Sequence, residues 1–367
     1  MRRYGMKTEN NFFKKLFAKN YRSRTISFLI IIVGYIVVEA LMMSGNLSSM
    51  FQSLLVPVTC YIVAAIGLNL NVGVSGELNL GQAGFMCIGA FSGVCVSGAL
   101  APFISNGIVR LLLAIVVGAV LAALFGMIIG IPVLKLQGDY LAIVTLAFGE
   151  IVKSLINNMY IGFDSEGFQF SFVDNNLHLG PGGKALINGP MGATGTERIS
   201  TFTIGVLLIL AALFIVYNLM YSRSGRAIMA CRDNRIAAES VGIHVANTKM
   251  LAFVVSASLA GAAGALYGLN YSTLVPSKFG FNLSILILVY VVLGGLGNMT
   301  GTIISTIVLV LLPELLRGLA DYRMIIYAVI LIITMILTNN EKFRGWMAKL
   351  KDSLSFKKQP KEVEAHE

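Results

Sequence analysis

Residues 221–249 read YSRSGRAIMACRDNRIAAESVGIHVANTK, a charged stretch between two apolar runs that are each long enough to cross a bilayer. Because membrane-spanning segments flank it, this stretch must lie at a membrane surface. Its five basic residues outnumber its two acidic ones: Arg223, Arg226, Arg232, Arg235 and Lys249 against Asp233 and Glu239. Loops rich in Lys and Arg stay on the cytoplasmic side, so we predict that this loop is cytoplasmic.

The same stretch is predicted to contain a short helix instead of a flexible linker. Asp233 and Asn234 are residue types that cap the start of a helix, and Gly242 is one that ends a helix in a left-handed turn. A rigid cytoplasmic helix tied to several spans is what a soluble partner needs in order to move the membrane part. The alternative is a solvated basic loop without a partner.

The composition places the chain in a bilayer. Hydrophobic residues make up 56% of its 367 residues and charged residues 13%, whereas about 25% of a soluble domain is charged. The net charge of +10 does not indicate nucleic acid, because the basic residues gather in the two tails and in the loop 222–248. Contact with lipid headgroups explains them better.

Ten apolar runs are long enough to cross hydrocarbon about 30 Å thick. They lie near residues 26–43, 52–72, 80–100, 108–133, 140–160, 201–221, 249–271, 283–297, 302–317 and 322–338. Either the short run at 283–297 or the region 78–100 can be re-entrant. The chain is therefore predicted to fold as an all-α, polytopic bundle of about 8–10 transmembrane helices with both termini in the cytoplasm.

The predicted domains follow from these spans: a basic cytoplasmic tail at 1–24, a transmembrane domain at 25–340 and a charged cytoplasmic tail at 341–367. Inside the transmembrane domain, 222–248 is the cytoplasmic loop and 160–200 an extracytoplasmic loop. Residues 162–200 contain four acidic residues and only two basic ones, and this shortage of basic residues favours the outer side of the membrane.

Small residues recur four apart in the predicted spans, as in Gly89/Gly93, Gly126/Gly130 and the ladder Ser256/Ala260/Gly264/Gly268. Such spacing lets helix backbones approach closely. It predicts a packed bundle and does not identify its function.

Little in the chain predicts catalysis. The three histidines, His178, His244 and His366, lie outside the spans, and no H-E-x-x-H motif occurs. Residues 182–185 read GGKA, which lacks the glycine spacing and the hydroxyl of a phosphate-binding loop. The four cysteines imply no disulfide framework. We predict a protein that is not an enzyme and holds no metal or cofactor of its own.

The segment 67–82 is unusually polar for a span boundary. It carries Asn69, Asn71, Glu77, Asn79 and Gln82 among glycines. Irregular backbone at membrane depth is tolerated where it is buried in protein or faces a water-filled cavity. This favours a gate or the wall of a passage, and a glycine-rich cytoplasmic turn is the alternative. Elsewhere, Glu150 and Lys153 lie three apart on one predicted helix and can neutralise each other.

Three blocks together resemble one family. They are 67–91, which begins GLN and ends LGQAGFMCIGAF, 136–153, LQGDYLAIVTLAFGEIVK, and 292–301, VLGGLGNMTG, followed by Leu312-Pro313-Glu314. They look like the permease subunits of branched-chain amino acid ABC importers, of the LivM type, and the resemblance covers about residues 55–335. The second block is the most specific of the three.

The resemblance also bears on the cytoplasmic loop. Permeases of ABC importers carry a signature of Glu-Ala-Ala, three residues and Gly that docks onto the ATPase subunit. Ala237, Ala238 and Gly242 fit this signature, but Ile236 stands where the family has glutamate. The docking role is expected to remain, on a more apolar surface. The expected docking residues are Arg226, Asp233, Ala237, Ala238 and Gly242.

By similarity, the complex would contain a second related permease, two ATP-binding subunits that hold ATP and Mg, and an extracytoplasmic binding protein. The chain would lie in the bacterial plasma membrane. The residues expected to line its passage are Asn69, Asn71, Glu77, Asn79, Gln82 and Thr145. For each of them, structural capping or interhelical hydrogen bonding is the alternative.

The family favours leucine, isoleucine and valine as substrates, but urea and short-chain amide importers use very similar permeases. An ion-coupled secondary carrier is a further alternative. Few carboxylates lie at mid-membrane in this sequence, which argues against proton- or sodium-driven transport.

Overall fold

The structure is a computed structural model. It describes residues 22–45, 48–136, 138–164, 167–172 and 184–316, together with isolated positions near 325–332. Residues 1–21 of the predicted N-terminal tail, the whole predicted C-terminal tail and nearly all of the predicted span at 322–338 lie outside the described residues. The chain divides into two compact units, one that ends at Val310 and one that begins at Leu311.

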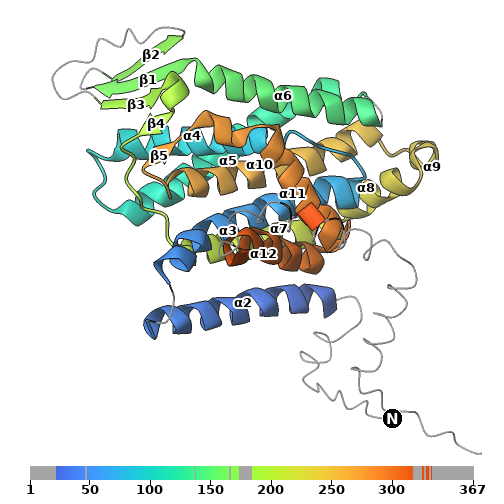
Figure 1. The fold of residues 1–367 in the computed structure, drawn as a ribbon. Helices are drawn as coiled ribbons and strands as arrows, with labels where there is room; N and C mark the ends of the chain where they lie inside the picture. Colours follow the sequence, from blue (N-terminus) through green and yellow to red (C-terminus); the bar gives the residue numbers. More distant parts are fainter. Residues whose placement is uncertain are drawn as a thin grey trace, which may run out of the picture. The chain divides into compact units, whose positions relative to one another are not determined.

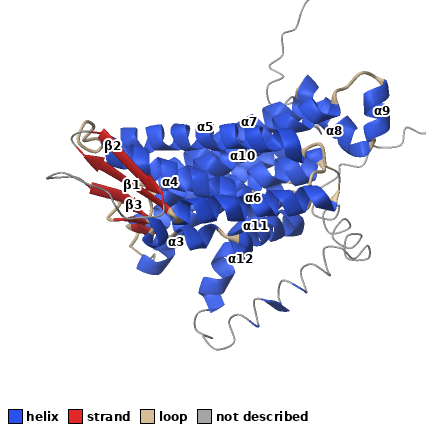
Figure 2. Cartoon of the chain, turned by 90° about the horizontal axis from the view of Figure 1, so that it is seen from above, coloured by secondary structure: helices blue, strands red, loops and turns tan. Residues whose placement is uncertain are grey.

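The described residues are mostly helical (Figures 1 and 2). The helices are α2 (Arg22–Met43), α3 (Ser49–Asn69), the π-helix η1 (Leu70–Ser75), α4 (Gln82–Leu100), α5 (Gly107–Val133), α6 (Asp139–Asn157), α7 (Phe202–Tyr221), α8 (Arg223–Asp233), α9 (Arg235–Ser240), α10 (Val245–Gly268), α11 (Phe281–Gly294) and α12 (Met299–Leu315), with 3-10 turns at Gly189–Met191 and Pro276–Phe279. The strands are β1 (Met159–Asp164), β2 (Gly167–Phe172), β3 (Lys184–Asn188), β4 (Ala193–Thr194) and β5 (Thr273–Leu274).

Seven of these helices are long and apolar enough to cross a membrane. They comprise α2, α3 with its continuation η1, α4, α5, α6, α7 and α10, while α11 and α12 are shorter apolar helices. The chain is thus a multi-pass helical membrane protein, as predicted. The run at 283–297 forms the 14-residue helix α11, which is short for a full crossing.

Helix α10 lies at the centre of the bundle, in contact with α3, α4 and α5. Its small residues allow backbones to touch: a Cβ atom added to Gly89 of α4 would lie 2.0 Å from the carbonyl oxygen of Gly261 of α10. One added to Gly264 would lie 2.0 Å from the carbonyl oxygen of Met86. The predicted packing through small residues is therefore observed, because any larger residue at these positions would separate the helices.

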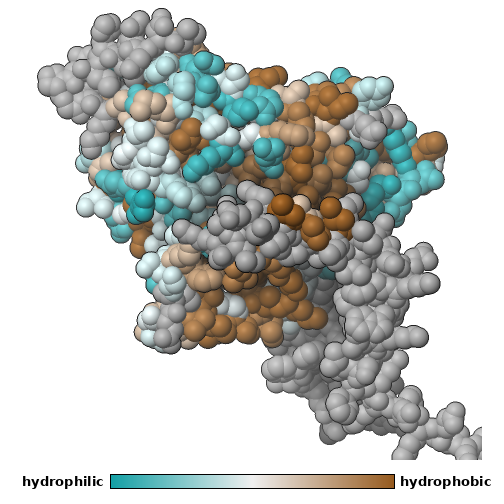
Figure 3. Space-filling view, in the orientation of Figure 1, coloured by the Kyte–Doolittle hydropathy of each residue, from teal (hydrophilic) through white to brown (hydrophobic). Residues whose placement is uncertain are grey.

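Apolar side chains cover the middle of the molecule in Figure 3, and hydrophilic ones lie toward its two ends. Helix α2 is the most exposed of the candidate spans, since only 11% of its most apolar window is buried. On α5, Val116 is 58% exposed and Ile128 is 64% exposed. In water such surfaces would be unfavourable, whereas in a bilayer they face lipid.

The predicted outer loop at 160–200 contains a small sheet that the sequence analysis did not anticipate. The three strands pair antiparallel in the order β2-β1-β3, and β4 pairs with β5 after α10. Strand β2 alternates Phe168, Phe170 and Phe172 with other residues, which is the two-residue period of a strand. Strand β1 follows α6 directly, so α6 ends at Asn157 instead of the predicted residue 160.

The strands and the helices α8 and α9 lie at opposite ends of the bundle in both ribbon views. That 160–200 and 222–248 lie on opposite sides of the membrane stays a prediction.

Candidate functional site

The loop 222–248 forms two capped helices where the sequence analysis expected one. Ser222 Oγ accepts a hydrogen bond from Gly225 N (3.0 Å) at the start of α8, and Asn234 Oδ1 accepts one from Ala237 N (3.0 Å) at the start of α9. The backbone of Asn234 is extended, which separates the two helices. Gly242 has φ of +85° and ends α9 in the predicted left-handed turn.

The α8–α9 pair has its own small core and carries exposed apolar side chains. Ala238 is buried against Cys231 and Val245, and burial raises the pKa of the Cys231 thiol. On the outside, Ile236 is 80% exposed and Val241 is 75% exposed. Exposed apolar side chains beyond the span ends have no lipid to face, so they are a candidate contact surface.

The predicted docking residues divide between this surface and the core. Four of them are exposed on α8 and α9 or at their ends: Arg226, Asp233, Ala237 and Gly242. Ala238 instead packs inward. The departure from the family signature, Ile236, is exposed, and a more apolar docking surface stays a prediction.

Arg232 joins α8 directly to the membrane part. Its Nη1 donates to the carbonyl oxygen of Gly73 in η1 (3.0 Å), while Nε and Nη2 bind Asp233 Oδ1 (3.0 and 2.9 Å). Its aliphatic stem covers Gly76, where an added Cβ atom would lie 2.6 Å from Arg232 Cγ. Gly76 also has φ of +76°, so both the contact with Arg232 and the backbone angle favour glycine at this position.

The π-helix η1 carries two buried side chains without partners. Asn71 and Ser75 are fully buried, and Asn71 Oδ1, Asn71 Nδ2 and Ser75 Oγ make no hydrogen bond within the described part of the chain. Short π-helical turns are frequent at functional sites. A buried polar group without a partner is costly, so this segment carries an energetic cost that its neighbours must offset.

Asn69, just before η1, holds the turn between α11 and α12. Its Oδ1 accepts from Gly297 N (2.8 Å) and its Nδ2 donates to Thr302 Oγ1 (2.8 Å). Gly73 lies against the same turn, because an added Cβ atom would be 2.1 Å from Gly297 N. Movement of η1 would therefore displace the α11–α12 turn.

After η1, Glu77 forms an ion pair with Lys249 near the start of α10. Both side chains are largely buried, at 14% and 13% exposed. Opposite charges attract each other more strongly where protein replaces water around them. The pair connects the end of η1 to the helix that follows α9 in the chain.

Three further polar residues hold the start of α4. Asn79 Oδ1 accepts from Gly81 N (2.8 Å), and Gln82 Nε2 donates to a backbone carbonyl of α3 (3.0 Å). Thr145 of α6 accepts from Leu80 N (3.0 Å). These are capping and interhelical bonds, the alternative that the sequence analysis left open for them.

The structure thus brings the predicted passage residues together around η1 and the start of α4, with Thr145 reaching them from α6. Glu77 is partly exposed and the other five are buried. Their lining of a passage stays a prediction. Among them, only Asn71 has a side chain that is buried and unsatisfied in the described part of the chain.

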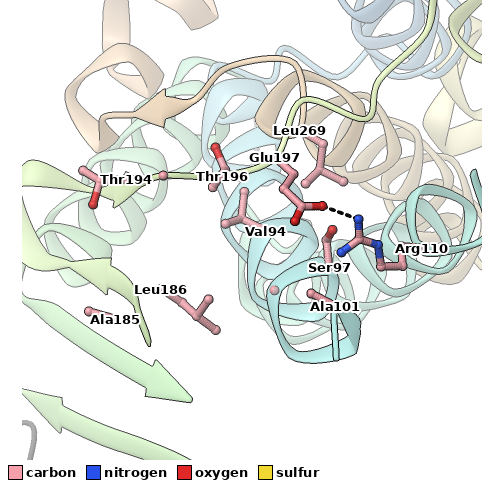
Figure 4. Close-up of a pocket in the computed structure, with 12 residues that line it drawn as sticks. Val94, Ser97, Ala101, Arg110, Ala185, Leu186, Thr194, Thr196, Glu197 and Leu269 are labelled. Carbon is pink, nitrogen blue, oxygen red and sulfur yellow. Dashed lines mark hydrogen bonds and ion pairs between the residues drawn. The ribbon is translucent and has the colours of Figure 1, made fainter. Parts of the chain in front are cut away.

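The opposite end of the bundle holds a hollow between α4, α5 and the strands (Figure 4). Arg110 Nη2, in the first turn of α5, binds Glu197 Oε2. The Arg110 side chain is 7% exposed and that of Glu197 is 62% exposed. The segment around Glu197 is held to the end of α10 by Ser200 Oγ, which donates to Leu266 O (2.7 Å).

Sequence reasoning missed Arg232, Ser75 and Arg110 as site residues. Arg110 had a readable signal, since it is a lone arginine inside an otherwise apolar run at 107–133. Arg232 had none beyond its charge, because its partner Gly73 lies 159 positions away in the sequence. The predicted ion pair of Glu150 with Lys153 is present, and Glu150 Oε1 also accepts from Phe281 N (2.9 Å).

The described residues offer no ready site for a metal ion. Nowhere among them do three His, Cys, Asp or Glu side chains lie close enough together to hold one.

Comparison with known proteins gives one family match. The family described as "Branched-chain amino acid transport system / permease component" matches residues 50–337. Among individual proteins, the chain is 34% identical over 221 residues to the high-affinity branched-chain amino acid transport system permease protein LivM of Salmonella typhimurium, and equally to LivM of Escherichia coli (strain K12). It is 30% identical over 149 residues to the corresponding permease protein LivH of Escherichia coli (strain K12).

These matches cover parts of each protein. The LivM matches cover 58% of this chain and 52% of the relative, and the LivH match covers 38% and 48%. The chain therefore spans about half the length of the curated relatives it matches. No solved structure matches the chain.

Proposed function

Because the chain belongs to the family of permease components of branched-chain amino acid transport systems, we propose that it is a permease subunit of an ATP-driven importer of branched-chain amino acids. It forms half of the translocation path, and the relatives LivM and LivH suggest a second, related permease as the other half. An extracytoplasmic binding protein delivers the substrate. The importer lies in the bacterial inner membrane.

The observation that carries this proposal is the capped α8–α9 pair. It has exposed apolar side chains at Ile236 and Val241, and a direct hydrogen bond into the membrane part through Arg232. A solvated loop without a partner needs neither feature. A soluble ATPase subunit that docks on this face would hold the pair and move it.

The mechanism follows from these contacts. Two ATP-binding subunits bind ATP and Mg and close on each other, and α8–α9 moves with them. Arg232 passes the displacement to η1, and the Asn69–Gly297 hydrogen bond passes it to the α11–α12 turn. The close backbone contacts of α10 with α4 make these helices move together. Such a shift changes the balance between outward- and inward-open forms.

The chain itself contributes no hydrolytic chemistry in this proposal. Its role is to bind the ATPase subunits, carry their movement and form a weakly polar path. A urea or amide importer would use the same mechanical parts with a different binding protein. An ion-coupled carrier would need no docking face.

Purification of the chain from its native membrane in mild detergent, followed by reconstitution into proteoliposomes, tests the proposal. We expect two ATP-binding subunits to co-purify, and uptake of labelled leucine to require ATP and the binding protein. Uptake driven by a proton or sodium gradient, with no ATPase subunit bound, would contradict it. Uptake of urea but not of leucine would keep the assignment as an ATP-driven importer and change its substrate to urea.

A further inference from the structure

The hollow at the outer end of the bundle has the chemical pattern of an amino acid site. It is lined by Arg110 and Glu197, by the apolar side chains of Val94 and Leu269 near them, and by Leu186 on the side of the strands. Sites for small molecules are mostly apolar, with a few polar groups that fix orientation.

Arg110 is placed to receive a carboxylate. Its guanidinium is almost fully buried, and its Nε makes no hydrogen bond within the described residues. Only Nη2 is used by Glu197. A buried arginine nitrogen without a partner is costly to keep, and a second carboxylate bound to the guanidinium would add a charge-assisted hydrogen bond.

Glu197 supplies the opposite charge. It contacts Arg110 through Oε2, and Oε1 has no partner among the described residues. Its side chain is 62% exposed, so it can receive an ammonium group from the outer side. The two charges remain paired while each binds one end of a zwitterion.

The apolar wall accounts for the third part of the ligand. Leu186 of β3 lies against Gly98 of α4, where an added Cβ atom would be 2.4 Å from Leu186 Cδ2. Val94 lies one turn earlier on the same helix, and Leu269 just after α10. A branched aliphatic side chain fits such a wall, whereas urea has nothing to place there.

We propose that this hollow is an entry site for a free zwitterionic aliphatic amino acid, with Arg110 for the α-carboxylate, Glu197 for the α-ammonium and the Val94–Leu186–Leu269 wall for the side chain. The inference rests on the proposed function, since it places the site on the path from the binding protein into the bundle. It goes beyond that function by assigning substrate recognition to the permease itself.

The assembled importer, in nanodiscs and without binding protein, tests this by ligand-observed saturation-transfer NMR. The probes are L-leucine, L-leucinamide, 4-methylpentanoate and urea. The wild-type protein is expected to bind leucine at least about tenfold more tightly than leucinamide or 4-methylpentanoate, since each analogue lacks one charge-assisted contact. Urea is expected not to bind.

Two variants assign the roles. Arg110→Gln should abolish the preference for leucine over leucinamide and retain the preference over 4-methylpentanoate. Glu197→Gln should abolish the preference for leucine over 4-methylpentanoate and retain the preference over leucinamide. Arg198→Gln is the matched control, because Arg198 is exposed on the same segment and outside the hollow. It should keep both preferences.

A wild-type protein that does not distinguish leucine from its two analogues would overturn the inference. So would Arg110→Gln and Glu197→Gln variants that weaken all probes equally, since that is the result of a purely structural ion pair. If Arg110→Gln fails to assemble, the probe preferences of the wild-type protein and of Glu197→Gln still test the inference. ATP-driven leucine uptake with normal selectivity of the whole importer, but no selectivity here, would refute the entry site and leave the proposed function standing.

Discussion

Arg232 shares its guanidinium between Asp233 and the carbonyl oxygen of Gly73, and so connects α8 to the π-helix η1 in the bundle. A hydrogen bond from a charged donor contributes about 1.5–3 kcal/mol. That is small compared with the packing of the helices, but it acts on η1, whose Asn71 and Ser75 carry buried polar groups without partners in the described part of the chain. A modest contribution at such a point can bias which conformation η1 adopts.

Replacement of Arg232 by alanine should therefore uncouple ATP hydrolysis from uptake. We expect uptake to fall at least about tenfold, as the loss of 1.4 kcal/mol or more would give, while ATPase activity of the assembled importer stays within about twofold. Arg232→Lys keeps a donor and should restore part of the uptake. The measurement is the ratio of leucine transported to ATP hydrolysed in proteoliposomes.

Arg223→Ala is the matched control for this change. Arg223 is an exposed arginine at the start of α8, and its removal should leave the ratio unchanged. Equal losses in the Arg223 and Arg232 variants would mean that net charge on the loop matters and that the bond to Gly73 does not.

At the level of elements, α8 and α9 are short helices whose stability depends on their caps and on a core around Ala238. Isolated helices of this length are marginal in water. Asn234 ends one helix and begins the next, and Gly242 turns the chain back toward α10. The pair is thus rigid enough to transmit force, while Ile236 and Val241 remain outside.

Replacement of Ile236 by aspartate tests this exposed face. An unpaired charge in an apolar interface is costly, so we expect the ATPase subunits to bind at least about tenfold more weakly, with a matching loss of uptake. Ile236→Leu keeps the apolar contact and serves as the control. Subunit retention on an affinity column reports the binding, and membrane insertion should be normal in both variants.

Retention of the ATPase subunits by Ile236→Asp would place their docking site elsewhere on the chain. Because the Ile236 side chain is exposed and outside the core of the α8–α9 pair, misfolding is not the expected consequence of the substitution.

The orientation of the whole molecule in the membrane is predicted from the charges of its two large loops and from the two polar ends of the bundle. The strands of 159–188 and the helices α8 and α9 lie at opposite ends. We expect a cysteine that replaces exposed Thr273, next to β4, to react with a membrane-impermeant maleimide from outside the cell. A cysteine at Ser240 should react only after the membrane is opened. The measurement is labelling in intact and permeabilised cells, in a background without the four native cysteines.

Labelling of both positions from the same side would invalidate the topology, and with it the outer placement of the hollow at Arg110. The native cysteines must be removed first because Cys95 is only partly buried.

The amino-acid sequence by itself determined the bilayer as the solvent, most of the membrane-spanning helices, the caps at Asn234 and Gly242 and the family resemblance, while the side of each loop stays a prediction. These depend on composition, on runs of about 20 residues and on local backbone preferences, all of which are readable over short distances. The strand pairing in 160–200 was missed, because that segment was interpreted by its charge and not by the alternation of its aromatic residues.

Only the tertiary structure decided which polar residues act together. Asn69, Gln82 and Thr145 bond within the bundle, and Asn71 does not. The contacts of Arg232 with Gly73 and of Arg110 with Glu197 join residues 159 and 87 positions apart. The physical reason is that such pairs form only once α10 has drawn α3, α4 and α5 together, and no local pattern records which side chains then meet.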